Sequence, residues 1–226
     1  PTSEQINELI ALYNDGEFEK GLLKIKYLLN FFPQAVVLFN LKGAFNAGLK
    51  RHSAAIKSYK IALELKPNFS GAYNNMSISQ REIGDSKSAI KSAKQALKIK
   101  PDFAEAYLNM GSAQHKKNDF FAAIESYKNA LKIKPDYADA YNNMGNAQRD
   151  MGDLETAIKS YKKTLKYRPN YAEAYNNIGI VFKDKGNLDQ AIDSYMQALK
   201  IKPNYAEAHS NMGIALKEKG NLKAAI

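Results

Sequence analysis

Six prolines recur at intervals of 34 residues along this chain: Pro33, Pro67, Pro101, Pro135, Pro169 and Pro203. Proline has no amide donor and its ring clashes with the preceding helical turn, so it is excluded from helix interiors. A helix breaker with a constant period indicates that one structural unit is repeated along the sequence. The units are numbered here so that the proline stands at position 32.

The sequence divides on this basis into seven units: 2–35, 36–69, 70–103, 104–137, 138–171, 172–205 and an incomplete 206–226. In each complete unit after the first, position 20 is Ala, position 21 is Ile, position 28 is Leu and position 34 is aromatic. So many aligned columns do not arise by chance. The repeated unit therefore has a defined structure of its own.

Two apolar stripes with helical spacing run through each unit. In the unit 104–137, Ala106 and Met110 belong to the first stripe, and Ala123 and Tyr127 belong to the second. An Asn-Asp, Gly-Asp or Gly-Asn pair stands between the stripes and suits a left-handed helix end followed by an N-cap. Each unit is predicted to be a helix–turn–helix hairpin, which buries its apolar face only by stacking on its neighbours.

Local detail is also predicted within each unit. Asp102 after the proline and Glu105 three residues later match the capping-box pattern at the start of the first helix. Small residues at positions 8 and 20 predict close approach of the two helices, with Tyr at position 24 filling the space beside them. The third unit has Ala93 in place of this Tyr, which predicts looser packing there.

The units resemble the tetratricopeptide repeat (TPR) family. The residues of one unit that match family positions are Tyr107, Met110, Gly111, Ala123, Tyr127, Ala130 and Pro135. The resemblance implies an all-α, right-handed superhelical solenoid of stacked hairpins, forming one continuous domain whose concave side is lined by the first helices. The first unit departs from the pattern at Gln5, Leu9 and Gly21, and is interpreted as a degenerate capping repeat with a polar outer face.

Asparagine fills position 6 of five successive units: Asn75, Asn109, Asn143, Asn177 and Asn211. These residues are called the Asn ladder below. Position 5 adds Asn40, Asn74, Asn142 and Asn176. Asparagine is a mediocre helix former, because its side chain competes for backbone hydrogen bonds, so the columns need an explanation.

Two explanations of the Asn ladder stay open at this point. A carboxamide both donates and accepts hydrogen bonds, so a row of them can bind the backbone of an extended peptide along the concave groove. Alternatively, the asparagines bridge adjacent first helices and order the stack. Because the second unit has Leu41 in place of the asparagine, we expect peptide binding to concentrate in the third to seventh units.

The motifs A-Y-N-N-M-G at 140–145 and A-Y-N-N-I-G at 174–179 resemble the TPR arm of O-GlcNAc transferase. They are also similar to the arms of bacterial proteins that carry sulfotransferase, glycosyltransferase or methyltransferase domains. The resemblance implies an extended peptide or protein as partner. The alternative hypothesis is a substrate-recognition arm of a transferase whose catalytic domain follows Ile226, where the sequence stops within a predicted helix. An open apolar end there also predicts end-to-end self-association.

A second column of interest lies one turn further along the first helix. Position 12 reads Arg81, His115, Arg149, Lys183 and Lys217, and position 13 reads Glu82, Lys116, Asp150, Asp184 and Glu218. The basic row favours acidic partner groups, whereas the adjoining acids favour a solvated face. A carboxylate clamp of the kind found in chaperone-binding TPR domains is not predicted, because positions 5 and 6 are mostly Asn.

The net charge of +10 does not by itself predict nucleic-acid binding. Most repeats carry Lys or Arg at positions 29 and 31, in the last turn of the second helix, where cations complement the helix dipole. RNA binding by analogy with pentatricopeptide proteins is disfavoured, because the period is 34 throughout. No apolar run is long enough to span a membrane, and we expect a soluble, cytoplasmic protein.

No catalytic, metal or cofactor site is predicted for this segment. The chain contains no cysteine, and His52, His115 and His209 occupy three different columns. Neither a nucleophile elbow nor a glycine-rich phosphate loop is present in the sequence. The leading hypothesis is therefore a non-catalytic scaffold for protein–protein interaction.

Overall fold

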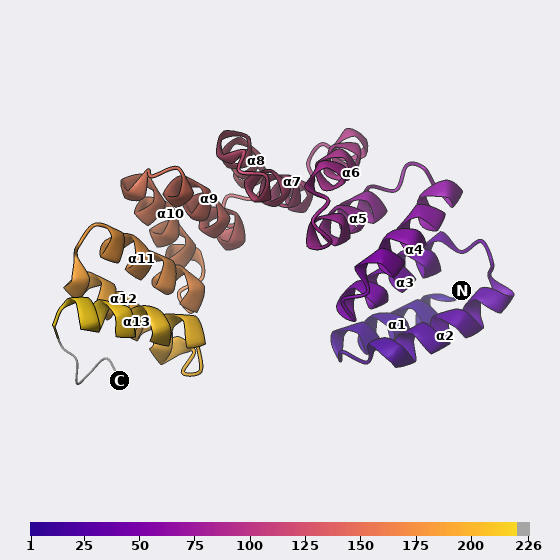
Figure 1. Ribbon diagram of the computed structural model, residues 1–226. Coiled ribbons are helices and arrows are strands. Elements are labelled where there is room, and N and C mark those ends of the chain that lie inside the picture. The colour runs from indigo at the N-terminus through magenta and orange to yellow at the C-terminus, as the bar shows by residue number, and fades with distance from the viewer. Residues whose placement is uncertain (221–226) are drawn as a thin grey trace. The chain divides into compact units, whose positions relative to one another are not determined.

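The computed structural model describes residues 1–220, which form thirteen α-helices and no strand (Figure 1). The helices are α1 (Ser3–Asn14), α2 (Phe18–Phe31), α3 (Val36–Gly48), α4 (His52–Leu65), α5 (Ser70–Glu82), α6 (Ser86–Ile99), α7 (Ala104–Lys116), α8 (Phe120–Ile133), α9 (Ala138–Asp150), α10 (Leu154–Tyr167), α11 (Ala172–Asp184), α12 (Leu188–Ile201) and α13 (Ala206–Glu218). The predicted all-α helical-repeat solenoid is confirmed. Among the helices within residues 1–220, none combines the length and the apolar character that spanning a bilayer requires.

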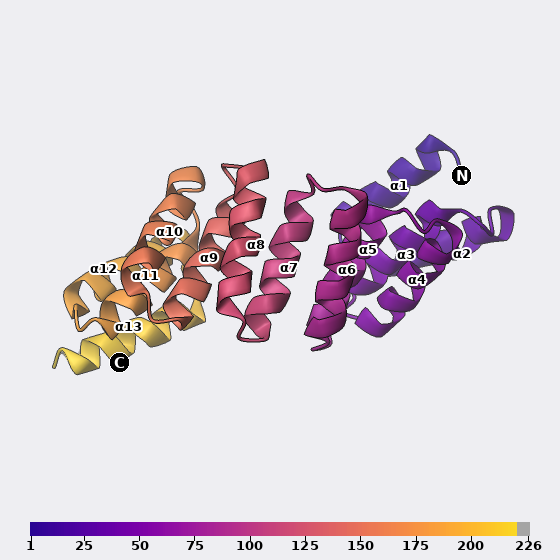
Figure 2. The ribbon, with the colours of Figure 1, turned by 90° about the horizontal axis from the view of Figure 1, so that it is seen from above.

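The helices belong to two compact units, Pro1–Asn118 and Asp119–Ile226. The first unit contains α1 to α7 and the second contains α8 to α13. Within each unit, consecutive helices lie side by side and pack against one another (Figure 2). The boundary falls at the turn between α7 and α8, within the unit 104–137 defined by the sequence period.

The turns within the hairpins are built as expected from left-handed residues and N-caps. Gly152 has φ 84° and Asn118 has φ 61°, the region that L residues other than Asn rarely adopt. The side chains of Asp85, Asp119 and Asp153 accept hydrogen bonds from the backbone N–H three residues later and cap α6, α8 and α10. This local chemistry fixes where each second helix begins.

The capping box predicted after each proline is wrong. Helix α7 begins one residue later than that pattern requires, with Phe103 as its N-cap, so Asp102 is left in the turn and makes no cap hydrogen bond. The Nζ of Lys100 lies 5.1 Å from the centre of the Phe103 ring, so the two side chains make a cation–π contact at the start of the helix. A capping box does occur at the start of α1, where Thr2 and Gln5 exchange side-chain and backbone hydrogen bonds.

The core of most hairpins is a glycine at position 8 facing a tyrosine at position 24. A Cβ atom added to Gly145 would lie 2.6 Å from Cε1 of Tyr161, so only glycine fits at this position. In the third repeat both columns change together, because Ser77 replaces the glycine where Ala93 replaces the tyrosine. Ser77 and Ala93 are both buried, so the larger residue at position 8 goes with the smaller residue at position 24.

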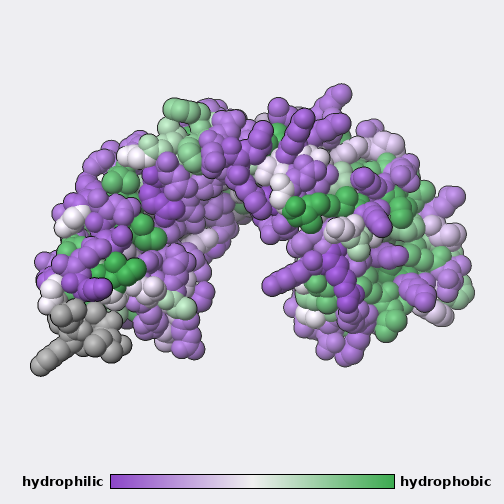
Figure 3. Space-filling view, viewed as in Figure 1, coloured by the Kyte–Doolittle hydropathy of each residue, from purple (hydrophilic) through white to green (hydrophobic). Residues whose placement is uncertain are grey.

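In the first repeat the glycine is on the second helix, and the aromatic ring that packs against it comes from the next repeat. Gly21 stands where the other repeats have Ala, and the ring of Phe45 occupies the space beside it. The polar outer face expected of a capping repeat is not found on α2, where Leu23, Tyr27 and Phe31 are all exposed. Leu23 and Tyr27 stand at positions 22 and 26, where later repeats carry mainly polar residues. Figure 3 shows hydrophobic residues gathered over the part of the molecule that contains α1 to α4.

Candidate functional site

The Asn ladder lies on the first helices of the hairpins, and four of its residues, Asn75, Asn109, Asn177 and Asn211, donate a hydrogen bond to the first helix before their own. In the N-terminal unit, the Nδ2 of Asn109 donates to the Oδ1 of Asn74 at 2.8 Å. The Nδ2 of Asn75 donates to the Oδ1 of Asn40 at 3.4 Å. In both cases an asparagine at position 6 bonds to the asparagine at position 5 of the preceding repeat.

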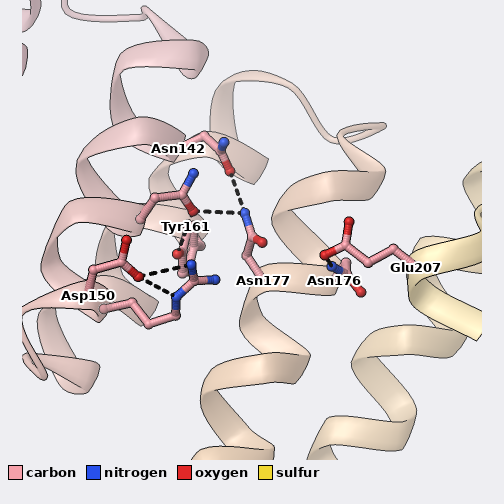
Figure 4. A network of polar contacts seen from close by, with 8 residues as sticks. Asn142, Asp150, Tyr161, Asn176, Asn177 and Glu207 are labelled. Atoms are coloured by element: carbon pink, nitrogen blue, oxygen red, sulfur yellow. Dashed lines mark hydrogen bonds and ion pairs between the residues drawn. The ribbon is translucent and has the colours of Figure 1, made fainter. Parts of the chain in front are cut away.

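The same connection recurs in the C-terminal unit and is elaborated there (Figure 4). The Nδ2 of Asn177 donates to the Oδ1 of Asn142 at 3.2 Å and to the Oδ1 of Asn146 at 3.1 Å. Asn146 also accepts a 2.8 Å hydrogen bond from the hydroxyl of Tyr161. The ladder is thus tied to the tyrosine that fills the core of the hairpin.

The last rung follows the same rule. The Nδ2 of Asn211 donates to the Oδ1 of Asn176 at 3.1 Å, and the Nδ2 of Asn176 donates to Oε1 of Glu207 at 3.2 Å. Asn176 is fully buried, so both ends of its carboxamide need these partners. The second explanation of the asparagine columns, a bridge between adjacent first helices, is therefore observed in the structure.

The two asparagine columns differ in their burial. Asn74, Asn142 and Asn176 at position 5 are buried, whereas the ladder residues at position 6 are only half-buried, Asn143 included. Within residues 1–220, the Oδ1 of Asn109 and that of Asn177 receive no hydrogen bond, while their Nδ2 groups are engaged. The Oδ1 atoms of these two ladder residues can therefore accept hydrogen bonds from a partner. Whether a peptide uses them stays a prediction.

The basic row at position 12 is largely paired with the acids beside it. Arg81 bonds to Glu82 at 2.8 Å and Arg149 bonds to Asp150 at 3.0 Å. The hydrogen bond from Arg81 lowers the pKa of the Glu82 carboxyl. Lys183 lies 3.6 Å from its neighbouring acid in the same way, while Lys217 is exposed near the end of α13. This arrangement favours a self-paired polar face over an open cationic one.

The basic residues at position 31 have partners as well. Arg168 makes a two-pronged contact with Asp139 at 2.9 and 3.1 Å, and the hydroxyl of Tyr171 donates to the same carboxylate at 3.0 Å. Lys202 makes a longer contact with Glu173 at 3.5 Å. These pairs join the two ends of a single repeat, so part of the positive charge is used in ion pairs within the fold.

Sequence reasoning missed Asn146 and Glu207 as members of the ladder network. Asn146 stands one helical turn after Asn142, at a spacing that puts both side chains on one face of α9, and this was the available signal. For Glu207 no local signal exists, because it approaches Asn176 from the next repeat. Across the described residues 1–220, no group of three or more metal-ligating side chains comes together.

Comparison with known proteins identifies the repeat. A family model described as TPR repeat matches residues 80–118, 115–152, 145–186 and 181–220. The peroxisomal targeting signal receptor of Candida albicans is 35% identical over 75 residues, which make up 33% of this chain and only 13% of the receptor. The match to this curated relative thus spans a small part of its length.

Two solved structures show the same architecture. The crystal structure of the APC/C hetero-tetramer Cut9–Hcn1 matches with a TM-score of 0.82 and 21% identity, covering 96% of this chain and 43% of that one. The crystal structure of MamA matches with a TM-score of 0.63 and 30% identity, covering 73% of this chain and 96% of that one. The chain therefore belongs to the tetratricopeptide repeat family, whose fold supports a scaffold for protein–protein interaction.

Proposed function

We propose that this chain is a non-catalytic scaffold that binds an extended peptide segment of a partner protein along the Asn ladder. The observation that carries the proposal is that the nitrogen and the oxygen of a ladder carboxamide have different roles. At Asn109 and Asn177 the Nδ2 group bridges the repeats, and the Oδ1 remains available as an acceptor. Such acceptors on successive first helices are suited to backbone N–H groups of an extended chain, whatever its side chains.

The bridges also prepare the ladder for binding. Each Nδ2 hydrogen bond holds its side chain in one orientation before a partner arrives, so little rotamer entropy is lost on binding. Asn177 is held by two such bonds, to Asn142 and Asn146. Preorganised acceptors of this kind raise affinity without adding contacts. The stacking role and the binding role thus support each other.

The relatives agree with this class of function. One of them is named as a receptor for a targeting signal, and another was solved as a hetero-tetramer. Both names describe recognition of or assembly with another protein. We infer that a protein or peptide is the partner here too.

A peptide array tests the proposal if the variants separate acceptor from donor. Asn109→Ala and Asn177→Ala remove both, whereas Asn109→Asp and Asn177→Asp remove the bridging donor but keep an acceptor oxygen. We expect the Ala pair to lose array binding and the Asp pair, which keeps the acceptor but loses the preorganising bridge, to retain part of it. Asn170→Ala, an exposed asparagine of an inter-repeat turn, is the matched control and should bind like the parent chain. Unchanged binding by the Ala pair would refute the proposal.

The alternative within the same class of site is the substrate-recognition arm of a larger transferase. The A-Y-N-N-M-G motif at 140–145 favours it, because it resembles the arms of such enzymes. The reading frame beyond Ile226 in the parent gene decides between the two. A transferase domain in that frame supports the arm, and a stop codon within a few repeats rules it out.

A further inference from the structure

A cavity of about 360 Å³ opens among the first helices α1, α3 and α5 of the N-terminal unit. Its wall is mostly apolar and includes Ile10, Tyr13, Leu41, Ala44, Tyr59 and Ile78. Asn40 and Asn75, the first hydrogen-bonded pair of the ladder system, also line it. The cavity therefore adjoins the surface on which the proposed peptide lies.

In the second repeat the residue at position 9, Ala44, is small and lines the cavity. In the fifth repeat Asn146 stands at position 9 and accepts a hydrogen bond from Tyr161. In the sixth repeat Ile180 stands there and packs against the cluster that contains Tyr195. Ala44 is too small to do either, and Tyr59 lines the cavity beside it.

Two hydroxyl groups in this wall lack partners. The hydroxyl of Tyr59 makes no hydrogen bond within residues 1–220, and burial followed by the nearby Tyr13 raises its pKa well above the ordinary value. Ser79 also lines the cavity, is fully buried, and its Oγ has no hydrogen-bond partner among the described residues. The position of Ser79 is Ala or Val in the four later repeats: Ala113, Ala147, Val181 and Ala215.

Unpaired hydroxyls in an apolar wall select a particular kind of occupant. A purely apolar side chain would leave them unsatisfied, which is costly in a buried site. A charged side chain would lose its hydration in an apolar cavity. A phenol satisfies both demands, because its ring packs on the apolar wall and its hydroxyl both donates and accepts.

We propose that this cavity binds a tyrosine side chain of the partner peptide. The inference rests on the proposed function, since the ladder would hold the backbone of the same peptide beside Asn40 and Asn75. The cavity would select one side chain of the peptide, whereas the Asn ladder would contact only the peptide backbone. The preference belongs to the N-terminal unit, where the ladder begins.

The test uses the isolated ligand pair N-acetyl-tyrosinamide and N-acetyl-phenylalaninamide, which differ by one hydroxyl. Each is titrated into the ¹⁵N-labelled chain, and amide shifts are followed at Leu41, Ala44 and Ile78. We expect saturable shifts with a Kd on the order of 1 to 10 mM for the tyrosine compound, a common range for so small a ligand. The phenylalanine compound should bind roughly five-fold more weakly. Equal affinities, or no saturable shift at these amides, would overturn the proposal.

Two variants at one position show whether the cavity is the site. Ala44→Ile should abolish the shifts by filling the cavity, and Ala44→Ser should keep them. The chain itself carries both residues at position 9, as Ile180 and Ser112, so the hairpin tolerates either. Amide spectra of the free variants confirm that they fold. Retained binding in Ala44→Ile overturns the proposal.

A third variant tests the role of the Ser79 hydroxyl. A fourth distinguishes binding in the cavity from binding along the Asn ladder. Ser79→Ala should reduce the preference for the tyrosine compound, and an unchanged preference would contradict the role of Ser79. Asn109→Ala should leave binding of the tyrosine compound unaltered while it reduces array binding. Saturable binding of the compound by a chain that binds no array peptide would support the cavity and refute the proposed function alone.

Discussion

Replacing Asn177 by Ala should destabilise the C-terminal unit, because this side chain joins two first helices. The variant loses the hydrogen bonds to Asn142 at 3.2 Å and to Asn146 at 3.1 Å. Asn146 keeps its bond from the hydroxyl of Tyr161. Asn142 is only 6% exposed and is left with an unsatisfied carbonyl oxygen. The unsatisfied oxygen of Asn142 lowers the free energy of unfolding more than the loss of the hydrogen bonds themselves.

The magnitude follows from these contacts. Each neutral hydrogen bond contributes about 1 kcal/mol, and an unsatisfied buried acceptor costs about 1 to 3 kcal/mol. The bond to Asn146 and the unsatisfied oxygen of Asn142 together cost about 2 to 4 kcal/mol. The better helix propensity of Ala returns about 0.5 kcal/mol, so the net loss for Asn177→Ala is about 1.5 to 3.5 kcal/mol. Asn75→Ala loses one bond whose length is 3.4 Å, near the limit of a hydrogen bond. Its cost should be offset by the gain in helix propensity.

Urea unfolding followed by far-ultraviolet circular dichroism gives the change in midpoint. Amide hydrogen exchange in α9 and α11 gives the local free energy, which is needed because repeat arrays depart from two-state behaviour. We expect faster exchange in both helices for Asn177→Ala and parent-like behaviour for Asn75→Ala. An equal loss in the two variants, or none for Asn177→Ala, would show that the bridges do not stabilise the stack.

Three further outcomes are expected. Gly179→Ser should cost about 1 to 3 kcal/mol by overpacking against Tyr195, and a double-mutant cycle with Tyr195→Ala should show favourable coupling, read from urea midpoints. Arg81→Ala should raise the pKa of Glu82 toward its ordinary value of 4.5, since the hydrogen bond that lowers it is lost; carboxyl ¹³C titration measures this. Burial raises the pKa of Tyr205 to about 12, so the folded state favours the neutral phenol. Its contribution to stability should be present below pH 10 and lost as the pH rises to 12, which urea midpoints across that range measure.

Most of the fold could be predicted from the sequence, because the information is local. Helical periodicity, the turn residues Gly152 and Asn118, and the caps such as Asp153 all act within a few residues. The predicted capping box failed because the N-cap is Phe103, which follows Asp102, and the ring of Phe103 lies against Lys100 from the helix before. A pattern of residue types cannot separate two such neighbouring start points.

The candidate site was predicted less completely. The asparagine columns are visible in the sequence, but the partner of each rung is not. Asn109 bonds to Asn74, which is 35 residues away and so one residue more than the period. This offset depends on how one hairpin is rotated against the next, which is a property of the stack. The cavity was missed for a related reason, since Ala44 reads as an ordinary small residue until Tyr59 is placed beneath it.

The offset has a consequence for how a partner would be selected. Because Asn109, Asn177 and Asn211 are bonded to the preceding repeat, replacing any of them is expected to loosen the stack. Position 9 lies one turn away on the same helix face and carries residues as different as Ala44, Asn146 and Ile180. The backbone of a peptide would thus be held by the asparagines at position 6, and its side chains would be distinguished by the residues at position 9. On this reasoning, exchanging residues at position 9 between repeats moves the preferred side chain along the peptide without altering the ladder.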